Sequence, residues 1–252
     1  MSDEQTPTQP QSTSEELIAV RREKLAKLKE LGLDPYGAAF ETTTTPGELK
    51  ANFGNDKSVK LGGRLLAIRD MGKSVFATLG DAHGRIQIYL NKKGVSETDW
   101  EAYQCLDLGD WIGVEGETFT TGKGEPSVKV EKLTVLSKAL RPMPDKWHGL
   151  SDRETKYRKR HLDLMSNQES ADLFVMRSKI VAEIRNFLHE RDYLEVETPM
   201  LHDVAGGAAA KPFETHHNAL SMPLTMRIAP ELHLKRLLGG GLTTVYELNR
   251  NF

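Results

Sequence analysis

Hydrophobic residues near the start of the chain recur at the spacing of one helical face. Residues 13–16 (Thr-Ser-Glu-Glu) precede them with the form of a helix capping box, and Gly32 and Pro35 end the run. One amphipathic helix is therefore predicted from about residue 14. Its apolar stripe consists of Leu17, Val20, Leu25, Leu28 and Leu31. Its other face carries Arg21, Arg22, Lys24, Lys27 and Lys29, which either contact phosphates or form a solvated surface.

From residue 59 to 136 the pattern changes to short alternating runs, which are typical of strands. These runs cover residues 61–68, 75–79, 86–90, 111–119 and 128–136, and glycine-containing turns separate several of them. A longer segment with helical character, 96–106, follows the third run. Five strands with a helix after the third are what an OB-fold barrel requires. Another small β-barrel or an open meander would have the same strand count.

The carboxyl-terminal part mixes helices and strands. A proline-broken connector, 141–144, and a basic cluster, 153–161, indicate a hinge between domains. A long amphipathic helix is predicted at about 170–191, and short strands at 193–196, 224–228 and 245–248 accompany a second helix at 231–238. The stripe of the long helix consists of Phe174, Ile180, Val181, Ile184, Phe187 and Leu188. The whole chain is therefore predicted to be a multidomain α+β protein.

The composition indicates the cellular location of the protein more clearly than its function. The 252 residues are 38% hydrophobic and carry a formal net charge of -2, so any basic surface for nucleic acid must be local. The lone Cys105 excludes an intrachain disulfide, and no apolar run approaches membrane-spanning length. Residues 1–13 are polar and are predicted to be a disordered tail without a secretory signal. A cytoplasmic protein without a membrane partner is expected.

Two residues of the predicted barrel suit single-stranded nucleic acid. An OB barrel binds unpaired bases on its strand face by stacking and by contacts to base edges. Phe76 on the second strand offers a ring, and Gln87 on the third offers an amide. A core role for Phe76 is the alternative that the pattern alone leaves open.

Three long stretches of the chain resemble the amino-terminal helix, the anticodon-binding barrel and the hinge of bacterial-type lysyl-tRNA synthetases, which are class II enzymes. They are VRREKLAKLKELGLDPYG, GRLLAIRDMGKSVFATLGDAHGRIQIYL and KALRPMPDKWHGLSDRETKYRKRHLDL. The resemblance implies a helix and OB-fold anticodon-binding domain at 14–137, a hinge at 138–162, and the start of an antiparallel-sheet catalytic core at 163–252. It also implies that Phe76 stacks on an anticodon base, while Gln87 and Glu125 hydrogen-bond the central uridine.

The resemblance to the catalytic domain of the family implies roles for further residues. Residues 191–201 resemble motif 1, whose proline, Pro199, belongs to the homodimer interface, and Asp192 stands where glycine is usual. Two later stretches, AGGAAAKPFETHHNAL and MRIAPELHLKRLL, resemble the segments that contact lysine. Gly207 then lets the substrate approach the backbone, and Glu231 holds the substrate ammonium as a buried carboxylate. An ordinary helix-start glutamate is the simpler interpretation of Glu231.

The resemblance also sets an expectation for catalysis. The motif 2 arginine, the motif 3 arginine and the magnesium carboxylates of the family correspond to positions after Phe252, so no catalytic residue and no metal ligand is assigned. The full-length enzyme is expected to ligate lysine to tRNA(Lys) through a lysyl-adenylate, using ATP and Mg²⁺, as a homodimer. The chain alone is expected to be inactive.

Two alternatives compete with this interpretation. A free-standing tRNA anticodon-binding module would use the barrel without any aminoacylation. An aspartyl or asparaginyl relative would share the barrel and motif 1. The residues Ala229-Pro230-Glu231 argue against the second alternative, since the aspartyl family carries Ser-Pro-Gln there.

Overall fold

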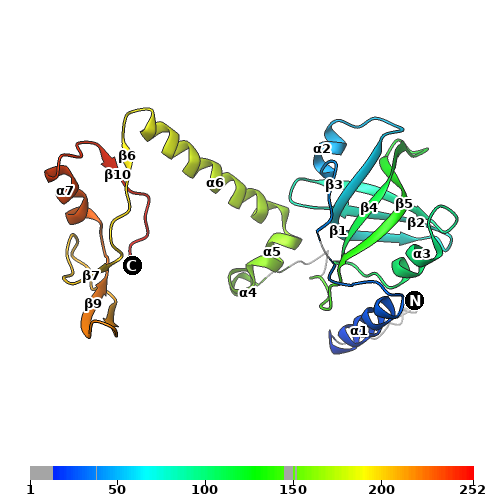
Figure 1. The fold of residues 1–252 in the computed structure, drawn as a ribbon, viewed down its shortest axis with the longest axis horizontal. Coiled ribbons are helices and arrows are strands. Elements are labelled where there is room, and N and C mark those ends of the chain that lie inside the picture. Colours follow the sequence, from blue (N-terminus) through cyan, green and yellow to red (C-terminus); the bar gives the residue numbers. More distant parts are fainter. Residues whose placement is uncertain (1–13, 38, 145–149, 151) are drawn as a thin grey trace, which may run out of the picture. The chain divides into compact units, whose positions relative to one another are not determined.

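A computed structural model describes residues 14–37, 39–144, 150 and 152–252 (Figure 1). The predicted disordered tail, 1–13, lies outside the described residues. The chain divides into two compact units, Met1–Leu162 and Asp163–Phe252, each of which is considered by itself. Among the described residues, no helix has the length and apolar character needed to cross a membrane.

The first unit contains a closed five-stranded barrel (Figure 1). Its strands are β1 (Ser58–Asp70), β2 (Ser74–Gly80), β3 (Arg85–Asn91), β4 (Trp111–Thr120) and β5 (Pro126–Ser137), in the order β1-β2-β3-β5-β4. The β3–β5 pair is parallel and the other pairs are antiparallel. Helix α3 (Glu97–Gln104) follows β3. This confirms the predicted OB-fold, and the closure of the barrel excludes an open meander.

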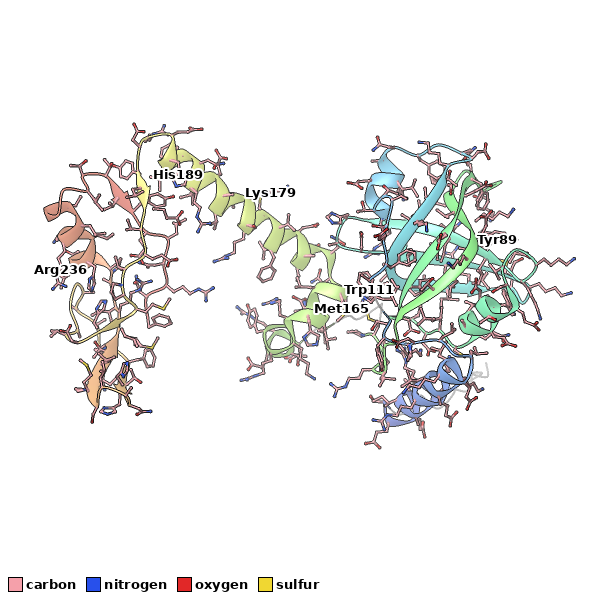
Figure 2. The ribbon with its side chains drawn as sticks, viewed as in Figure 1. Tyr89, Trp111, Met165, Lys179, His189 and Arg236 are labelled. Carbon is pink, nitrogen blue, oxygen red and sulfur yellow. The ribbon has the colours of Figure 1, made fainter. Side chains whose placement is uncertain are left out.

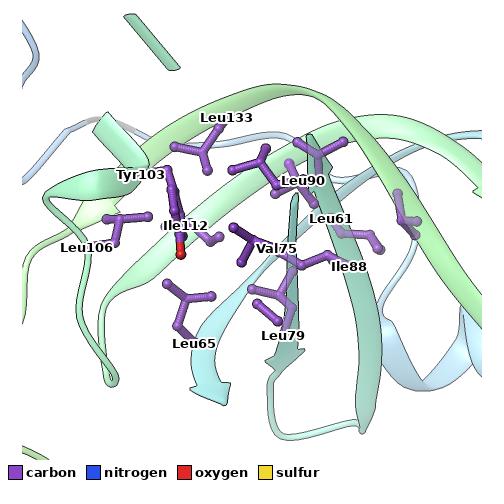
Figure 3. Packing of buried hydrophobic residues seen from close by; sticks show 14 of the residues in the cluster. Leu61, Leu65, Val75, Leu79, Ile88, Leu90, Tyr103, Leu106, Ile112 and Leu133 are labelled. Atoms are coloured by element: carbon purple, nitrogen blue, oxygen red, sulfur yellow. The ribbon is translucent and has the colours of Figure 1, made fainter. Parts of the chain in front are cut away.

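Alternation along the strands separates the core from the outer face. On β2, Val75, Ala77 and Leu79 are buried, whereas Phe76 and Thr78 between them are only partly buried. Strands β1, β3 and β4 contribute Leu61, Ile88, Leu90 and Ile112 to the same core (Figure 3). Phe76 therefore lies on the outer face, because successive side chains of a strand point to opposite faces. The core alternative for Phe76 is wrong.

Helix α1 (Ser14–Glu30) packs through a face that coincides only in part with the predicted stripe. Leu28 is buried as expected, but Leu17 and Val20 are exposed, and Arg21 is buried. The Arg21 guanidinium donates hydrogen bonds to the carbonyl oxygens of Ala139, Arg141 and Leu108 at 2.8, 3.2 and 3.1 Å. The barrel rim thus offers carbonyl acceptors, and a guanidinium with several donors satisfies them where an apolar side chain would leave them unpaired.

A buried charge cluster completes this attachment. Lys138, whose side chain is fully buried, lies 2.6 Å from Asp107 and 2.8 Å from the buried Asp110, and Lys24 of α1 lies 2.6 Å from Asp107. Burial tends to raise the pKa of the Asp107 carboxyl, but the hydrogen bonds from Lys138 and Lys24 outweigh this effect, and the pKa is lowered. Two of the basic residues of α1 are therefore anchors to the barrel. Arg22, Lys27 and Lys29 remain exposed.

A short helix, α2 (Pro46–Ala51), precedes the barrel and was not predicted. Thr45 and Glu48 form a complete capping box, and Pro46 occupies the first turn, where its missing N–H costs nothing. The helix packs closely on the turn between β2 and β3, because a side chain at Gly47 would collide with the carbonyl oxygen of His83. Helix α2 therefore borders the outer face of β3.

The residues after the barrel form one long helix and several short elements. Helix α4 (Arg153–Arg158) and helix α5 (Arg160–Ser166) lie near the boundary of the units, and α6 spans Gln168–His189. Then come β6 (Leu194–Glu195), β7 (Leu201–His202), β8 (Glu214–His217), β9 (Met222–Met226), α7 (Glu231–Gly239) and β10 (Val245–Tyr246). Strands β6 and β10 pair in parallel, and β7-β9-β8 form an antiparallel sheet. The helices and strands predicted from residue 170 onward are confirmed apart from small shifts, while α4, α5, β7 and β8 were not predicted.

The end of α6 is attached to the two-stranded sheet by polar contacts. The hydroxyl of Tyr246 on β10 donates to Glu195 at 3.1 Å and lies 3.0 Å from Nε2 of His189, at the end of α6 (Figure 2). Arg185 of α6 contacts the same carboxylate at 2.9 Å. These contacts fasten α6 to β6 and β10. Most of the apolar stripe of α6 is exposed, with Ile180 and Phe187 about half accessible.

Candidate functional site

The outer face of the barrel carries a groove of about 670 Å³ that brings the three predicted base-contacting residues together. Phe76 comes from β2, Gln87 from β3, and Glu125 from the turn before β5. The other lining residues are Lys50, Arg69, Met71, Thr78, Arg85, Ile86, Thr121, Gly122 and Lys123. Because four of these are basic, the groove combines a ring, polar groups and positive charge, which suits a single-stranded nucleic acid.

Strand register places the ring and the amide on one face. Thr78 lies opposite Gln87, and Phe76 lies opposite Tyr89, so these four side chains share the outer face of β2 and β3. The rings of Phe76 and Tyr89 have centroids 4.9 Å apart and are tilted by 40°. Tyr89, seen on the barrel in Figure 2, is held by Ser74 and Asn91, and these hydrogen bonds lower its pKa. The ring of Phe76 is thus supported from one side.

Glu125 lies at the mouth of the groove on a tight turn. Its backbone N–H donates to Thr121 Oγ1 at 3.0 Å, and the N–H of Thr121 donates to the Glu125 carbonyl at 3.1 Å. The Glu125 carboxylate is about half exposed and lies 4.0 Å from Nζ of Lys50 on α2. A pair this exposed and this far apart is weak, so the carboxylate can exchange partners at little cost.

In the second unit, the two residues predicted to contact lysine are neighbours. Gly207 has φ +92°, and a Cβ there would lie 3.2 Å from Cβ of Ala229 and 3.6 Å from Cβ of Glu231. Glycine fits this position because other residues rarely adopt such a φ and because the segment before α7 is so close. The loop around Gly207 therefore runs beside the start of α7.

The expectation that Glu231 is a buried carboxylate is wrong for this chain. Its side chain is half exposed and accepts a hydrogen bond from Nζ of Lys235, one turn later, at 2.5 Å. Glu231 is in the first turn of α7, where the helix dipole favours a negative charge and no described neighbour encloses it. The carboxylate already pairs with an ammonium, which is the group that it is expected to bind.

A buried ion pair joins the motif 1 segment to the end of the chain and was not anticipated from the sequence. Arg227 and Glu247 are 2.7 Å apart, with side chains only 3% and 4% exposed. Thr198 donates to Glu247 through its backbone N–H at 3.2 Å and its hydroxyl at 2.7 Å, and Arg227 also donates to the Thr198 carbonyl at 3.1 Å. Burial raises the pKa of Glu247, but these hydrogen bonds lower it overall. The network fixes the backbone next to Pro199.

Asp192, which departs from the motif 1 pattern, and a pair of histidines can be placed in the structure. Asp192 has φ +59°, the left-handed region in which glycine is favoured, so the replacement carries backbone strain. His233 on α7 has its ring 4.6 Å from the ring of His202. Burial and the neighbouring His202 lower the pKa of His233. Nε2 of His202 donates to the carbonyl of Pro199 at 3.0 Å.

The donor groups of the described residues do not fit a metal centre. Nowhere in the described part of the chain do three or more His, Cys, Asp or Glu side chains converge in a way that could hold an ion.

Comparison with known proteins identifies both halves. A family described as "OB-fold nucleic acid binding domain" matches residues 59–136, and one described as "tRNA synthetases class II (D, K and N)" matches residues 152–252. A lysine–tRNA ligase of Carboxydothermus hydrogenoformans is 52% identical over 239 residues, which is 94% of this chain and 49% of the relative. One from Streptococcus thermophilus is 53% identical over 242 residues, covering 92% and 49%.

A lysine–tRNA ligase of Bacillus cereus agrees, with 51% identity over 244 residues, 93% of this chain and 49% of the relative. The chain thus spans about half the length of the curated relatives it matches. The name that these relatives share decides against the aspartyl and asparaginyl alternative. With a closed OB barrel, a class II segment and this degree of identity along its length, the chain belongs to the lysyl-tRNA synthetase family.

Proposed function

We propose that the protein acts in the ligation of lysine to tRNA(Lys), and that the chain supplies the recognition of the anticodon. The groove is the observation that carries this proposal. It gathers Phe76, Gln87 and Glu125, the three positions that the family resemblance implies, among basic residues. A ring that stacks on a base, an amide that reads its edge, and cations that attract the phosphates form a complete set for unpaired RNA.

The second unit supports a lysine site that is built around Gly207 and Glu231. Lys235 forms an exposed ion pair with Glu231 in this chain. The ammonium of a bound lysine would replace Lys235 on the carboxylate. Since exposed pairs one helical turn apart are worth only about 0.3–0.5 kcal/mol, this exchange costs little.

ATP, Mg²⁺ and a second copy of the protein belong to the same proposal for the whole enzyme. Membership of a class II family supports the use of ATP with magnesium. The exposed apolar residues of α6 support a contact near motif 1 and Pro199 with a second copy. A cytoplasmic location is consistent with a lone, buried Cys105.

Binding of a hairpin RNA with the lysine anticodon loop tests the recognition role. We expect Phe76→Ala to weaken binding by about 1–3 kcal/mol, the usual value of one base–aromatic stack. The matched control is Tyr36→Ala, which removes an aromatic that is 52% exposed and does not line the groove. Equal affinities of Phe76→Ala and Tyr36→Ala for the hairpin, with both variants folded, would remove the basis of the proposal.

A further inference from the structure

Behind the groove, the side chain of Gln87 is held by a buried serine. Strand register places Gln87 on β3 opposite Ser127 on β5, and Nε2 of Gln87 donates to Oγ of Ser127 at 2.8 Å. Ser127 is fully buried and does not line the groove, whereas Gln87 does. The serine therefore does not face the groove itself, but it contacts two residues that do, Gln87 and Glu125.

The direction of this hydrogen bond follows from the other contact of Ser127. Its Oγ lies 3.2 Å from the carbonyl oxygen of Glu125, and a carbonyl can only accept. Ser127 must therefore donate its single hydroxyl proton to Glu125. The same oxygen can then only accept from Gln87, so the group of the amide that faces Ser127 is the NH₂ group.

A fixed amide presents a fixed chemical face to the groove. With Nε2 turned toward Ser127, the oxygen Oε1 is the atom left for a ligand, and none of the described residues donates a hydrogen bond to it. An acceptor at this position pairs with a base whose edge carries a ring N–H, such as N3–H of uracil. Cytosine has a lone pair at N3, which would face the lone pairs of Oε1.

We propose that Ser127 is a positioning residue that sets the polarity of Gln87 and so makes the groove select uridine over cytidine at the base that Gln87 reads. The inference rests on the proposed anticodon-binding function. Ser127 does not touch the base. Its role is to make rotation of the Gln87 amide costly, because the rotated amide would set its oxygen against an oxygen that has no proton left to give.

The ratio of the affinities for two RNA hairpins distinguishes a positioning role of Ser127 from a mere contribution to the stability of the barrel. The probes are two RNA hairpins that differ only in having uridine or cytidine at the centre of the lysine anticodon. We expect the unmodified 252-residue chain to prefer uridine by about 5- to 150-fold, the range for one paired base edge. Ser127→Ala should reduce the preference to within about 3-fold, mainly by gaining affinity for cytidine once the amide can rotate. Ser127→Thr keeps the hydroxyl on a residue suited to strands and should keep the preference.

Controls distinguish failure of the inference from failure of the proposed function. Ser137→Ala makes the same change at the far end of β5 and should leave the preference intact. An unmodified chain without a preference for uridine would contradict the proposed function, and the inference with it. If the unmodified chain prefers uridine and a folded Ser127→Ala keeps the full preference, only the inference is overturned.

A second measurement needs no variant. The side-chain NH₂ of Gln87 should exchange its protons with water more slowly than that of the exposed Gln104 in NMR spectra, because its donor faces buried Ser127. Equally fast exchange of the two amides would show that the NH₂ group faces solvent, and it would overturn the inference even if Ser127→Ala failed to fold.

Discussion

The barrel keeps its apolar side chains inside, whereas the unit from Asp163 to Phe252 leaves most of its apolar side chains exposed. All but one of the buried hydrophobic residues of the described chain lie before residue 136; the exception is Tyr246. The other buried residues from Asp163 onward are polar: Asp163, His202 and Arg227. The barrel therefore has a hydrophobic core of its own. The elements of the second unit are held to one another mainly by hydrogen bonds and ion pairs.

The two units gain their stability in different ways. A closed barrel satisfies its strand edges internally and buries one face of every strand, so its core does not depend on the second unit. The second unit has short strands, and its exposed apolar residues include Phe187, Leu201 and Phe213. Exposed apolar surface of this kind is typical of regions that contact other protein. The two units should consequently respond to mutation independently.

The largest expected effect is at the buried ion pair of the second unit. Arg227→Met leaves the Glu247 carboxylate buried without its partner, which typically costs about 3–5 kcal/mol. Hydrogen exchange should become fast from residue 194 onward while the amides of the barrel stay protected. Arg177→Met, an exposed arginine on α6, is the matched control. Loss of protection in the barrel together with the second unit would contradict the independence of the units.

The next effect is in the barrel core. Leu79→Ala deletes a fully buried side chain and should destabilise the barrel by about 2–5 kcal/mol in urea unfolding. Leu220→Ala in the second unit removes a side chain that is 67% exposed, and should change stability by less than about 0.5 kcal/mol. Similar losses from the two substitutions would mean that the second unit buries its leucines after all.

A smaller effect concerns the attachment of α1 to the barrel and depends on pH. Because the pKa of Asp107 is lowered from 3.8 in the folded chain, its contribution to stability is complete above that pH. The contribution is lost as the pH falls through the lowered value. Protease protection of α1 should therefore decrease in acid before the barrel unfolds. Lys24→Met should weaken the protection already at neutral pH, unlike Lys27→Met at an exposed site of the same helix.

The smallest change in stability is expected at two residues, one in each unit, that share a left-handed backbone conformation. Asp56 in the barrel unit and Asp192 in the second unit both have φ +59°. Replacing either with glycine removes the steric cost of a left-handed residue, while the unfolded chain gains freedom, so each variant should be stabilised by no more than about 1 kcal/mol. Chemical denaturation monitored separately in each unit measures this. Destabilisation by Asp192→Gly beyond 1 kcal/mol would show that its carboxylate has a role.

The sequence was sufficient to predict the barrel because alternation is a local signal. Each strand shows its inward face directly, as Val75, Ala77 and Leu79 do, and the order of strands and helix then indicated the OB-fold. The joint presence of Phe76, Gln87 and Glu125 in one groove followed from the family resemblance. Residue spacing alone could not predict that these three residues lie together. Strand β5 pairs with β3 although β4 lies between them along the chain.

Polar contacts between residues far apart in the sequence could not be predicted from local sequence patterns. The basic face of α1 predicted solvent or phosphate, yet Arg21 binds carbonyl groups more than 80 residues away in sequence. The pair of Arg227 and Glu247 and the link from Ser127 to Gln87 depend in the same way on segments that only the fold brings together. The capping box at Thr45 was a local signal for α2 that could have been found in the sequence.

The most direct test of base recognition by the groove uses tRNA(Lys) variants in which the central anticodon base is replaced by each of the other three. We predict that every replacement weakens binding to the chain by at least about 5-fold, and that Gln87→Ala and Glu125→Ala remove most of this difference. Binding of all four tRNAs with one affinity would contradict the account, since the groove would then attract RNA without reading it.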